Sequence, residues 1–185
     1  MDQAALTRDL IALIQKLSYR KGDFTLASGK KSSFYIDMKV TTLHPEGAHL
    51  IGELAVDVLK QSGIDVGGVG GLTLGADPIA TAVSLAAYRH GMKWPAYIVR
   101  KEAKDHGTSR YVEGTENLAP GASLIVLEDV VTTGGSSIKA IERLRAAGYK
   151  PEAVLTVVDR EQGGAEAFAQ VGVKFLSLVK LSQLG

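Results

Sequence analysis

The sequence contains no cysteine. This absence excludes a disulfide framework, a thiolate nucleophile and a cysteine-ligated zinc site, and it fits a reducing compartment. Neither sign of charge is in excess, because 21 Lys and Arg face 20 Asp and Glu, for a net charge of +1. A chain with this balance has no electrostatic reason to take nucleic acid or an anionic membrane as its main partner. Any anion-binding site must therefore be local.

No stretch of the sequence is apolar over the length needed to cross a membrane. The N-terminal segment MDQAALTRDLIALIQKL mixes charged and apolar residues at helical spacing and lacks the apolar region of a signal peptide. The 185 residues are enough for one ordinary domain with its own core. We therefore predict a soluble cytoplasmic protein that forms a single domain over residues 1–185.

Two kinds of periodicity divide the first third of the chain. Apolar residues recur at helical spacing over residues 2–18 and 46–62, which predicts two amphipathic helices. Asp2 is the expected N-cap of the first helix, and Gly63 ends the second. Within residues 23–38, the short runs FTL and SFYID flank a turn with Gly and Lys, which predicts a β-hairpin with a cationic turn.

From residue 64 onward, strand-like and helix-like segments alternate, which predicts an α/β fold with a parallel, doubly wound sheet. Ligands of such sheets bind beyond the carboxyl ends of the strands, so polar residues there should converge on one rim. Strands are expected near residues 64–70, 95–100, 122–128, 153–158 and 173–179, and helices near 76–90, 136–147 and 164–170. The expected rim residues are Gly70, Gly71, Arg100, Glu128, Asp129, Asp159 and Arg160.

One segment, residues 101–120, does not fit this alternation. Its sequence KEAKDHGTSRYVEGTENLAP is polar, lacks periodicity and is long for a connection between a strand and a helix. Long polar loops at a ligand-binding rim are often lids, so we predict a mobile loop here.

The stretch LIVLEDVVTTGGSS, residues 124–137, combines a buried strand with polar chemistry. The apolar run LIVL predicts a strand buried on both faces, and it ends at two adjacent carboxylates, Glu128 and Asp129. TTGGSS then leads into a predicted helix, where hydroxyls and free backbone N–H groups meet the positive end of the helix dipole. A phosphate cradle beside acceptors for hydroxyl groups predicts a phosphorylated sugar as ligand. A Walker loop would need a lysine after the glycines, and no G-x-G-x-x-G follows the strand.

This stretch resembles the phosphoribosyl-pyrophosphate (PRPP) motif of type I phosphoribosyltransferases, in which an apolar strand, two acids, two apolar residues and a Thr/Gly loop follow one another. Within that superfamily the chain is similar to the orotate phosphoribosyltransferases. RKEAKDHG at residues 100–107 matches their catalytic-loop signature, and FTLASGKKSSFYID matches their orotate-side hairpin. Asp159 and Arg160, followed by EQGG, match a base-contacting segment.

The resemblance implies a fold, a reaction and an assembly. The fold is the type I phosphoribosyltransferase fold, with a small N-terminal hood formed by residues 1–45. The reaction transfers the phosphoribosyl group of PRPP to orotate and yields orotidine 5′-monophosphate and pyrophosphate, in pyrimidine nucleotide synthesis. Mg²⁺ is held mainly through PRPP, without a direct protein ligand. The functional unit is a homodimer, in which the catalytic loop within residues 101–120 closes over an active site of the neighbouring subunit.

The resemblance also implies roles for individual residues. Glu128 and Asp129 hold the ribose hydroxyls, and the loop from Thr132 to Ser136 holds the 5-phosphate. Lys101, Lys104 and His106 are the expected catalytic residues, with the largest effect at Lys104. The complete set expected to bind PRPP is Arg100, Lys101, Lys104, His106, Glu128, Asp129, Val130, Val131, Thr132, Thr133, Gly134, Gly135 and Ser136. Cations at the pyrophosphate would stabilise the negative charge that develops there in the transition state, so no protein nucleophile is required.

Position 132 bears on the choice of base. Hypoxanthine and guanine transferases have an Asp there that can exchange a proton with the purine, whereas Thr132 can hydrogen-bond but cannot act as a general base near neutral pH. Orotate carries a carboxylate, which Arg160 can bind with its planar fork. The expected orotate-binding residues are Thr132, Arg160, Phe34 and Tyr35. As alternatives, Arg160 pairs with Glu161 or a helix terminus, and Phe34 and Tyr35 touch the base only through their backbone.

Several positions depart from the family pattern or lie outside its motifs. Position 27 is Ala where some members have Lys, and GGLTLGADPIA lacks a Lys that many carry, with Lys30 and Lys31 as candidate substitutes. Asp77 is expected to be the N-cap of the next helix, with a PRPP contact as the alternative. Three histidines without ligand spacing are expected to be structural: His44, His49 and His90.

Two other functions are compatible with a PRPP motif. One is a transferase for another base, such as a purine. The other is a regulator that senses PRPP without turnover. The intact cations of RKEAKDHG argue against a regulator, and the near-neutral charge lacks the basic footprint of a DNA-binding protein.

Overall fold

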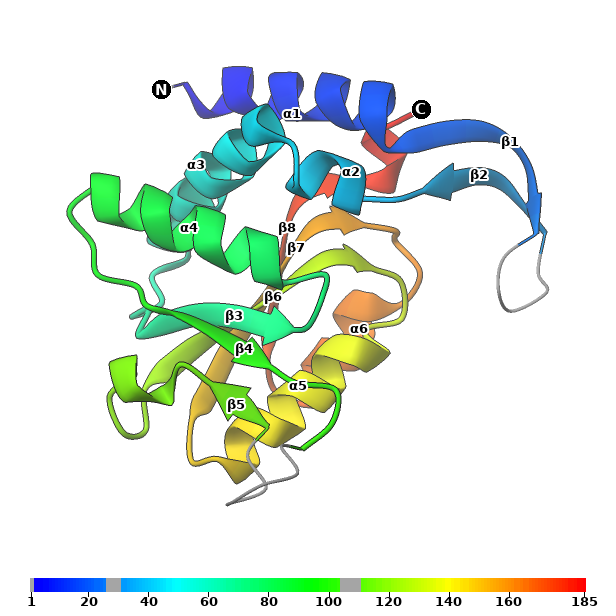
Figure 1. The fold of residues 1–185 in the computed structure, drawn as a ribbon. Helices are drawn as coiled ribbons and strands as arrows, with labels where there is room; N and C mark the ends of the chain where they lie inside the picture. Colours follow the sequence, from blue (N-terminus) through cyan, green and yellow to red (C-terminus); the bar gives the residue numbers. More distant parts are fainter. Residues whose placement is uncertain (1, 26–30, 104–110) are drawn as a thin grey trace.

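A central β-sheet with helices on both faces organises the protein (Figure 1). The computed structural model describes residues 2–25, 31–103 and 111–185. The strands are β1 (Tyr19–Thr25), β2 (Lys31–Ile36), β3 (Gly68–Leu72), β4 (Ala96–Val99), β5 (Val112–Glu113), β6 (Ser123–Val131), β7 (Lys150–Asp159) and β8 (Lys174–Lys180). The helices are α1 (Gln3–Leu17), α2 (Lys39–Thr42), α3 (Pro45–Ser62), α4 (Asp77–Arg89), α5 (Gly135–Ala146) and α6 (Gly164–Gln170), with 3-10 turns at Thr115–Asn117 and Leu181–Gln183. Among the helices of these described residues, none is long and apolar enough to span a membrane.

The large sheet has the strand order β5-β4-β3-β6-β7-β8. Strands β4, β3, β6, β7 and β8 run parallel, and β5 is antiparallel to β4. The predicted doubly wound, mostly parallel α/β fold is therefore confirmed. Since β4 lies on one side of β3 and β6 on the other, the order of the strands reverses between β3 and β6. Such a reversal opens a crevice beyond the carboxyl ends of these two strands.

Two hydrophobic clusters pack on opposite faces of the sheet. Ile125 and Leu127 of β6 belong to the cluster with α1, α3 and α4, whereas Leu124 and Val126 belong to the cluster with α5 and α6. Successive side chains of a strand point to opposite faces, so both faces of β6 are buried. This double burial explains the uninterrupted apolar run LIVL in the sequence.

Strand β6 extends further than the sequence predicts. It is paired with β3 only as far as Gly70 and Val126, but it continues beside β7 to the pair Val131 and Asp159. The prediction that the strand gives out at the two acids is therefore wrong. Glu128 and Asp129 lie inside β6, beyond the last residue of this strand that pairs with β3.

The N-terminal elements are a helix, α1, and a β-hairpin, β1 and β2. Asp2 caps α1, because its Oδ1 accepts a hydrogen bond of 3.1 Å from the N–H of Ala4, and Gly63 ends α3 with a left-handed φ of 73°. β1 and β2 form the predicted antiparallel hairpin, which projects from the body of the protein (Figure 1). β1 begins at Tyr19, earlier than the run FTL indicates. The turn residues 26–30 lie outside the described residues.

Two local predictions differ from the structure, and one short element was missed. The polar segment 101–120 contains β5 and a 3-10 turn, and it is not a loop throughout, since β5 pairs with the edge of β4. The short helix α2 was not predicted. Asp77 is not an N-cap, because Ala76 holds that position and the Asp77 carboxylate accepts a hydrogen bond of 2.6 Å from the Thr73 hydroxyl. Elements of two to four residues are too short to show periodicity, so they depend on tertiary contacts.

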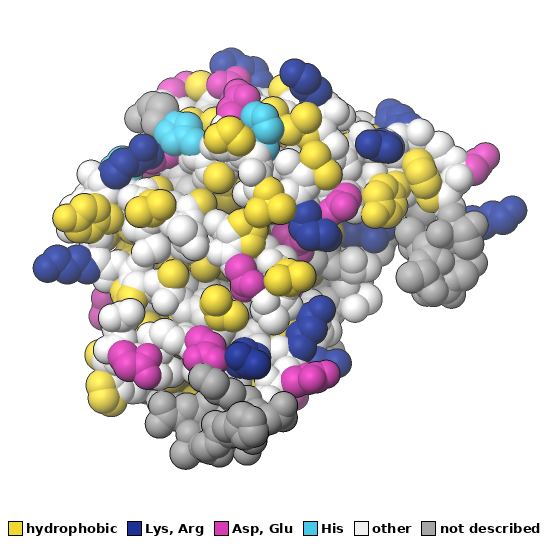
Figure 2. All heavy atoms as spheres, in the orientation of Figure 1, with side chains coloured by type: hydrophobic (Ala, Val, Ile, Leu, Met, Phe, Trp, Pro, Cys, Tyr) yellow, Lys and Arg dark blue, Asp and Glu magenta, His cyan; other side chains and the backbone are white. Residues whose placement is uncertain are grey.

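Charges of both signs are interspersed on the face of the protein shown in Figure 2. Hydrophobic side chains lie between them over the α2 and α4 side of this face. The exposed apolar residues of that region are Val40, Leu43, Leu74, Leu85 and Tyr88.

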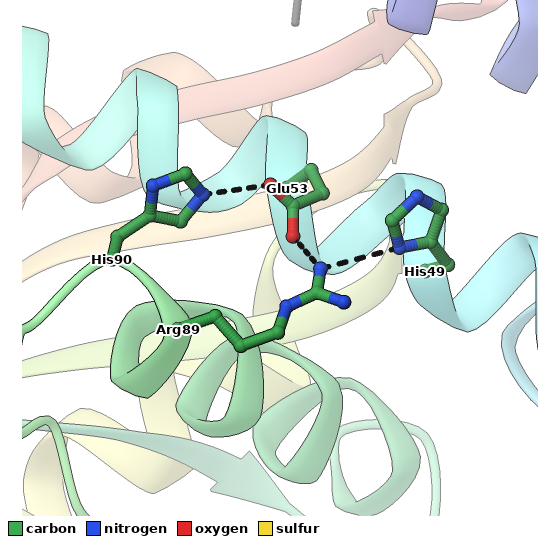
Figure 3. A network of polar contacts seen from close by, with 4 residues as sticks. All are labelled: His49, Glu53, Arg89 and His90. Atoms are coloured by element: carbon green, nitrogen blue, oxygen red, sulfur yellow. Dashed lines mark hydrogen bonds and ion pairs between the residues drawn. The ribbon is translucent and has the colours of Figure 1, made fainter.

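A buried carboxylate links α3 to α4. Glu53 of α3 is 4% exposed and accepts hydrogen bonds from Arg89 and, at 2.7 Å, from His90 (Figure 3). His49, one turn earlier on α3, lies 3.4 Å from the Arg89 guanidinium. His49 and His90 therefore belong to a polar network that joins two helices.

Replacing Glu53 with glutamine is expected to lower the free energy of unfolding by about 2 kcal/mol, because the amide keeps the shape but loses charge-assisted hydrogen bonds to Arg89 and His90. Urea unfolding measures this loss. Asp57→Asn, farther along α3, is the matched control and should change stability by about 0.5 kcal/mol or less. Equal effects of the two substitutions would contradict a stabilising role of the network.

Candidate active site

The paired carboxylates of β6 leave the strand on opposite sides. Glu128 points toward the start of α5, where its Oε2 accepts hydrogen bonds from the hydroxyls of Ser136 at 2.7 Å and Ser137 at 2.9 Å. Asp129 lies on the side of the β3–α4 connection, since a Cβ atom at Gly75 would be 2.9 Å from its Oδ1. The two carboxylates thus lie toward different elements, Glu128 toward α5 and Asp129 toward the β3–α4 connection.

Burial raises the pKa of Glu128 to about 7. The negative charge of Asp129 also raises this pKa, whereas the hydroxyl donors of Ser136 and Ser137 lower it. Only 6% of Glu128 is exposed, so desolvation of its charged form is the largest cause. A carboxyl group titrating near neutral pH is consistent with a binding site that exchanges its hydrogen-bond partners.

The raised pKa gives stability a defined pH dependence. The unfolded carboxyl of Glu128 loses its proton near the ordinary value of 4.5 and the folded one near 7, so the folded state binds more protons between these values. The free energy of unfolding should therefore fall as pH rises from 4.5 to 7, by about 3 kcal/mol from this group. Urea unfolding across this range, with Glu128→Gln as comparison, measures the difference. Identical pH slopes for the two proteins would contradict the assignment.

The loop after β6 leads into the N-terminus of α5. Gly134 precedes the first residue of α5 with a left-handed φ of 83°, and the first-turn N–H groups of a helix have no acceptor within that helix. The loop packs on α6, because a Cβ atom at Gly134 would be 2.7 Å from the Phe168 ring. Thr132 is half-buried and Thr133 is exposed. The predicted phosphate loop therefore lies at the N-terminus of α5, beside Glu128.

The cationic segment, residues 100–107 with the sequence RKEAKDHG, begins at the end of β4, on the same rim of the sheet. The Arg100 N–H donates to the carbonyl of Tyr111 at 2.8 Å, and its guanidinium lies 3.1 Å from the Glu113 carboxylate of β5. Lys101 is exposed. Lys104 and His106 lie outside the described residues.

The end of β7 meets the hairpin. The Arg160 N–H donates to the Val131 carbonyl at 2.9 Å, and the Arg160 guanidinium lies 5.0 Å from the centre of the Phe34 ring. Tyr35 is 45% exposed and packs against Phe24 with ring centres 5.6 Å apart. The structure thus brings Arg160 to the ring of Phe34, whereas the ring of Tyr35 packs within the hairpin. The Glu161 carboxylate accepts a hydrogen bond from the Ser182 N–H and forms no ion pair with Arg160 among the described residues.

Two side chains near the site were missed by sequence reasoning. The Ser137 hydroxyl binds Glu128, and its position after Ser136 in TTGGSS was the available signal. Lys39 follows the hairpin and forms an ion pair of 3.0 Å with Asp37, which raises the Lys39 pKa. The charge of Asp129 contributes to the same shift, so Lys39 is a further cation near the crevice.

Known proteins resemble the chain over almost its whole length. It is 51% identical over 183 residues to an orotate phosphoribosyltransferase of Nostoc sp., covering 99% of this chain and 87% of the relative. The orotate phosphoribosyltransferase of Rhodopirellula baltica is 42% identical and matches 100% and 98% of the two chains. No protein-family model matches the chain.

Solved structures show the same arrangement. The orotate phosphoribosyltransferase of Mycobacterium tuberculosis H37Rv in complex with Fe(III) dicitrate superposes with a TM-score of 0.85 at 39% identity, covering 97% of this chain and 99% of the other. The same enzyme in complex with PRPP gives a TM-score of 0.80 at 35% identity and the same coverage. One solved relative with this fold is thus a complex with PRPP.

Proposed function

The chain belongs to the orotate phosphoribosyltransferase family, and from this premise we propose how its residues perform the reaction of that family. It transfers the phosphoribosyl group from PRPP to orotate and releases pyrophosphate, which makes it a pentosyltransferase of pyrimidine nucleotide synthesis. The observation that supports the proposed site is that Glu128 contacts Ser136 at the N-terminus of α5, while its neighbour Asp129 lies beside the β3–α4 connection.

PRPP is proposed to bind beyond the carboxyl ends of β3 and β6, with its 5-phosphate at the N-terminus of α5. The N–H groups and hydroxyls from Thr132 to Ser136 bind the 5-phosphate, which the positive end of the helix dipole stabilises. Glu128 and Asp129 accept hydrogen bonds from the ribose hydroxyls. In the free protein the Ser136 and Ser137 hydroxyls hold Glu128, so sugar hydroxyls can take over the place of these donors when PRPP binds.

The bond between the anomeric carbon and pyrophosphate is proposed to break with positive charge on the ribose and negative charge on the leaving group. Arg100, Lys101, Lys104 and His106 lie in the segment proposed to meet the pyrophosphate. Cations there bind the transition state more strongly than the ground state, because the negative charge of the leaving group grows as the bond breaks. The orotate nitrogen then forms the new bond, and no covalent intermediate with the protein is needed.

Orotate is proposed to bind between the β7 end and the hairpin. Arg160 offers a cation for the orotate carboxylate or a carbonyl edge, and its guanidinium already lies over Phe34. Thr132 can donate or accept one hydrogen bond, and the backbone near Phe34 and Tyr35 can supply more. The arrangement suits an acidic pyrimidine, which needs donors rather than a general base.

Mg²⁺ is proposed to arrive with PRPP, because this ion favours oxygen ligands and commonly binds through substrate phosphates. The described residues contain no cluster of three His, Asp or Glu side chains able to hold a metal ion. In this proposal diphosphate oxygens and water would supply most of its ligands, and the ion would neutralise charge on the leaving group.

A homodimer with shared active sites is proposed as the functional unit. Its support is the group of exposed apolar side chains on one side of the protein, where Leu74 is 70% exposed and Tyr88 is 71% exposed. Mixing Lys104→Ala and Asp129→Asn proteins tests it. If the loop serves the neighbouring site, half of the dimers are mixed and contain one intact site each, so about a quarter of the activity should return. No recovery after verified subunit exchange would exclude shared sites.

A cytoplasmic location is also proposed, and the cysteine-free composition supports it because it fits a reducing compartment.

The loss of orotate ultraviolet absorbance on mixing the protein with orotate, PRPP and Mg²⁺ tests the function. Competition with hypoxanthine, guanine and adenine tests the choice of base, and none of the three should slow orotate turnover strongly. Protection by PRPP against heat without turnover of any base would favour the regulator. Turnover of a purine but not of orotate would favour the purine transferase.

A further inference from the structure

One arginine of α5 contacts both described ends of the segment that carries Lys104 and His106. The Arg143 guanidinium donates through Nη1 to the carbonyl of Arg100 at 2.5 Å and through Nη2 to the carbonyl of Lys101 at 2.9 Å. Its central carbon lies 4.4 Å from the centre of the Tyr111 ring. A single side chain thus joins Arg100 and Lys101, which precede positions 104–110 in the chain, to Tyr111, which follows them.

These contacts depend on the shape of the arginine side chain. The planar fork presents two separate nitrogens to two successive carbonyls, and the flat face of the guanidinium stacks on the aromatic ring. A lysine would bring one nitrogen and no flat face. The two carbonyls belong to the backbone that leaves β4, so their positions set the direction in which this segment begins.

Arg100, before positions 104–110, also contacts residues that follow them. The Arg100 N–H donates to the Tyr111 carbonyl at 2.8 Å, and the Arg100 guanidinium pairs with Glu113 of β5. These contacts hold Arg100 and Tyr111 close together. Arg143 adds a fixed point on α5, the helix whose N-terminus forms the phosphate cradle.

We propose that Arg143 is a positioning residue for phosphoribosyl transfer, which holds both ends of the cationic segment in register with the phosphate cradle of α5. The inference rests on the proposed role of Lys104 and His106 at the pyrophosphate. Arg143 acts through the backbone of Arg100 and Lys101 and through the Tyr111 ring. Small displacements of catalytic groups are costly, since a shift of about 1 Å can reduce a rate about a hundredfold.

Arg143→Ala, Arg143→Lys and the control Arg145→Ala test the proposal. Arg145 also belongs to α5 and donates to a backbone carbonyl, that of Val171 at 2.7 Å, but this contact lies beyond α6 and not at the cationic segment. The control therefore removes an equivalent contact from the same helix. The measurements are kcat and KM with orotate and PRPP, the Kd of ribose 5-phosphate, and urea unfolding.

Arg143→Ala should lower kcat about tenfold or more. The Kd of ribose 5-phosphate should stay within about twofold of wild type, because the phosphate cradle is untouched, and Arg145→Ala should keep kcat within about twofold. Arg143→Lys should recover part of the loss, since one nitrogen can reach one carbonyl. In a Lys104→Ala background, Arg143→Ala should lower kcat by less than about threefold, because the group that it positions is already gone.

Three outcomes would overturn the proposal while wild-type turnover of orotate stands. Equal kcat losses for Arg143→Ala and Arg145→Ala would show a general effect on α5. A loss that is as large in the Lys104→Ala background would show that Arg143 does not act through Lys104. A loss accompanied by weaker ribose 5-phosphate binding would place the effect at the cradle. Absence of orotate turnover in the wild-type protein would instead overturn the proposed function, and this inference with it.

Discussion

Lys104→Ala is expected to lower kcat for orotate at least about a hundredfold, which corresponds to about 3 kcal/mol of transition-state stabilisation. The reason is electrostatic: the pyrophosphate gains negative charge as its bond to the ribose breaks, and the ammonium group of Lys104 is proposed to meet that charge. A loss confined to the transition state should reduce kcat and kcat/KM by similar factors. The decrease of orotate absorbance under saturating PRPP and Mg²⁺ measures it.

The control for this prediction is Lys93→Ala, which removes an exposed lysine from the connection between α4 and β4. It should leave kcat within about twofold of wild type. Binding of ribose 5-phosphate, which lacks the pyrophosphate, should be unchanged in Lys104→Ala. A variant that keeps more than about a tenth of wild-type kcat would remove Lys104 from the catalytic role.

Gly134→Ala is expected to lower the free energy of unfolding by about 2–4 kcal/mol, for two separate reasons. The φ of 83° is strained for any residue with a side chain, and the new Cβ atom would lie 2.7 Å from the Phe168 ring. Phe168 is fully buried and packs on Phe175, so the ring cannot move away freely. The phosphate cradle would shift with the loop, and the affinity for ribose 5-phosphate should fall as well.

Substitutions of two other glycines distinguish the effect of backbone strain from the effect of the contact with Phe168. Gly148 has a φ of 84° and open space around it, so Gly148→Ala should cost about 1 kcal/mol from backbone strain alone. Gly135 lies in α5 with open space and without a positive φ, so Gly135→Ala should leave stability equal or slightly higher. Urea unfolding of the three variants gives the comparison. A loss at Gly134 no larger than that at Gly148 would show that the contact with Phe168 does not restrict the loop.

Much of the fold is predictable from periodicity, since long elements carry their own pattern. The helices near residues 2–18 and 46–62 and the alternation after residue 64 match the structure because burial on one or two faces constrains many residues at once. The short elements α2 and β5 were missed because two to four residues carry no such pattern. Asp77 was wrongly predicted as an N-cap, since its carboxylate bonds to Thr73 instead.

The sequence by itself predicted the chemistry that we propose for the site. An apolar strand, two acids, a Thr/Gly loop and a separate cationic segment together indicate a phosphoribosyl ligand. This combination of features is far more specific than any one of them alone. Those features are local in the chain, and local patterns can be recognised without knowledge of the fold.

Only the tertiary structure decided how these segments meet. β3 ends beside a β6 that continues, so Glu128 and Asp129 lie beyond the last residue of β6 that pairs with β3. The contact of Arg160 with Phe34 joins residues that are far apart in the chain, and so does the hold of Arg143 on Arg100. Such contacts follow from the packing of whole elements against one another, and no single stretch of sequence contains that information.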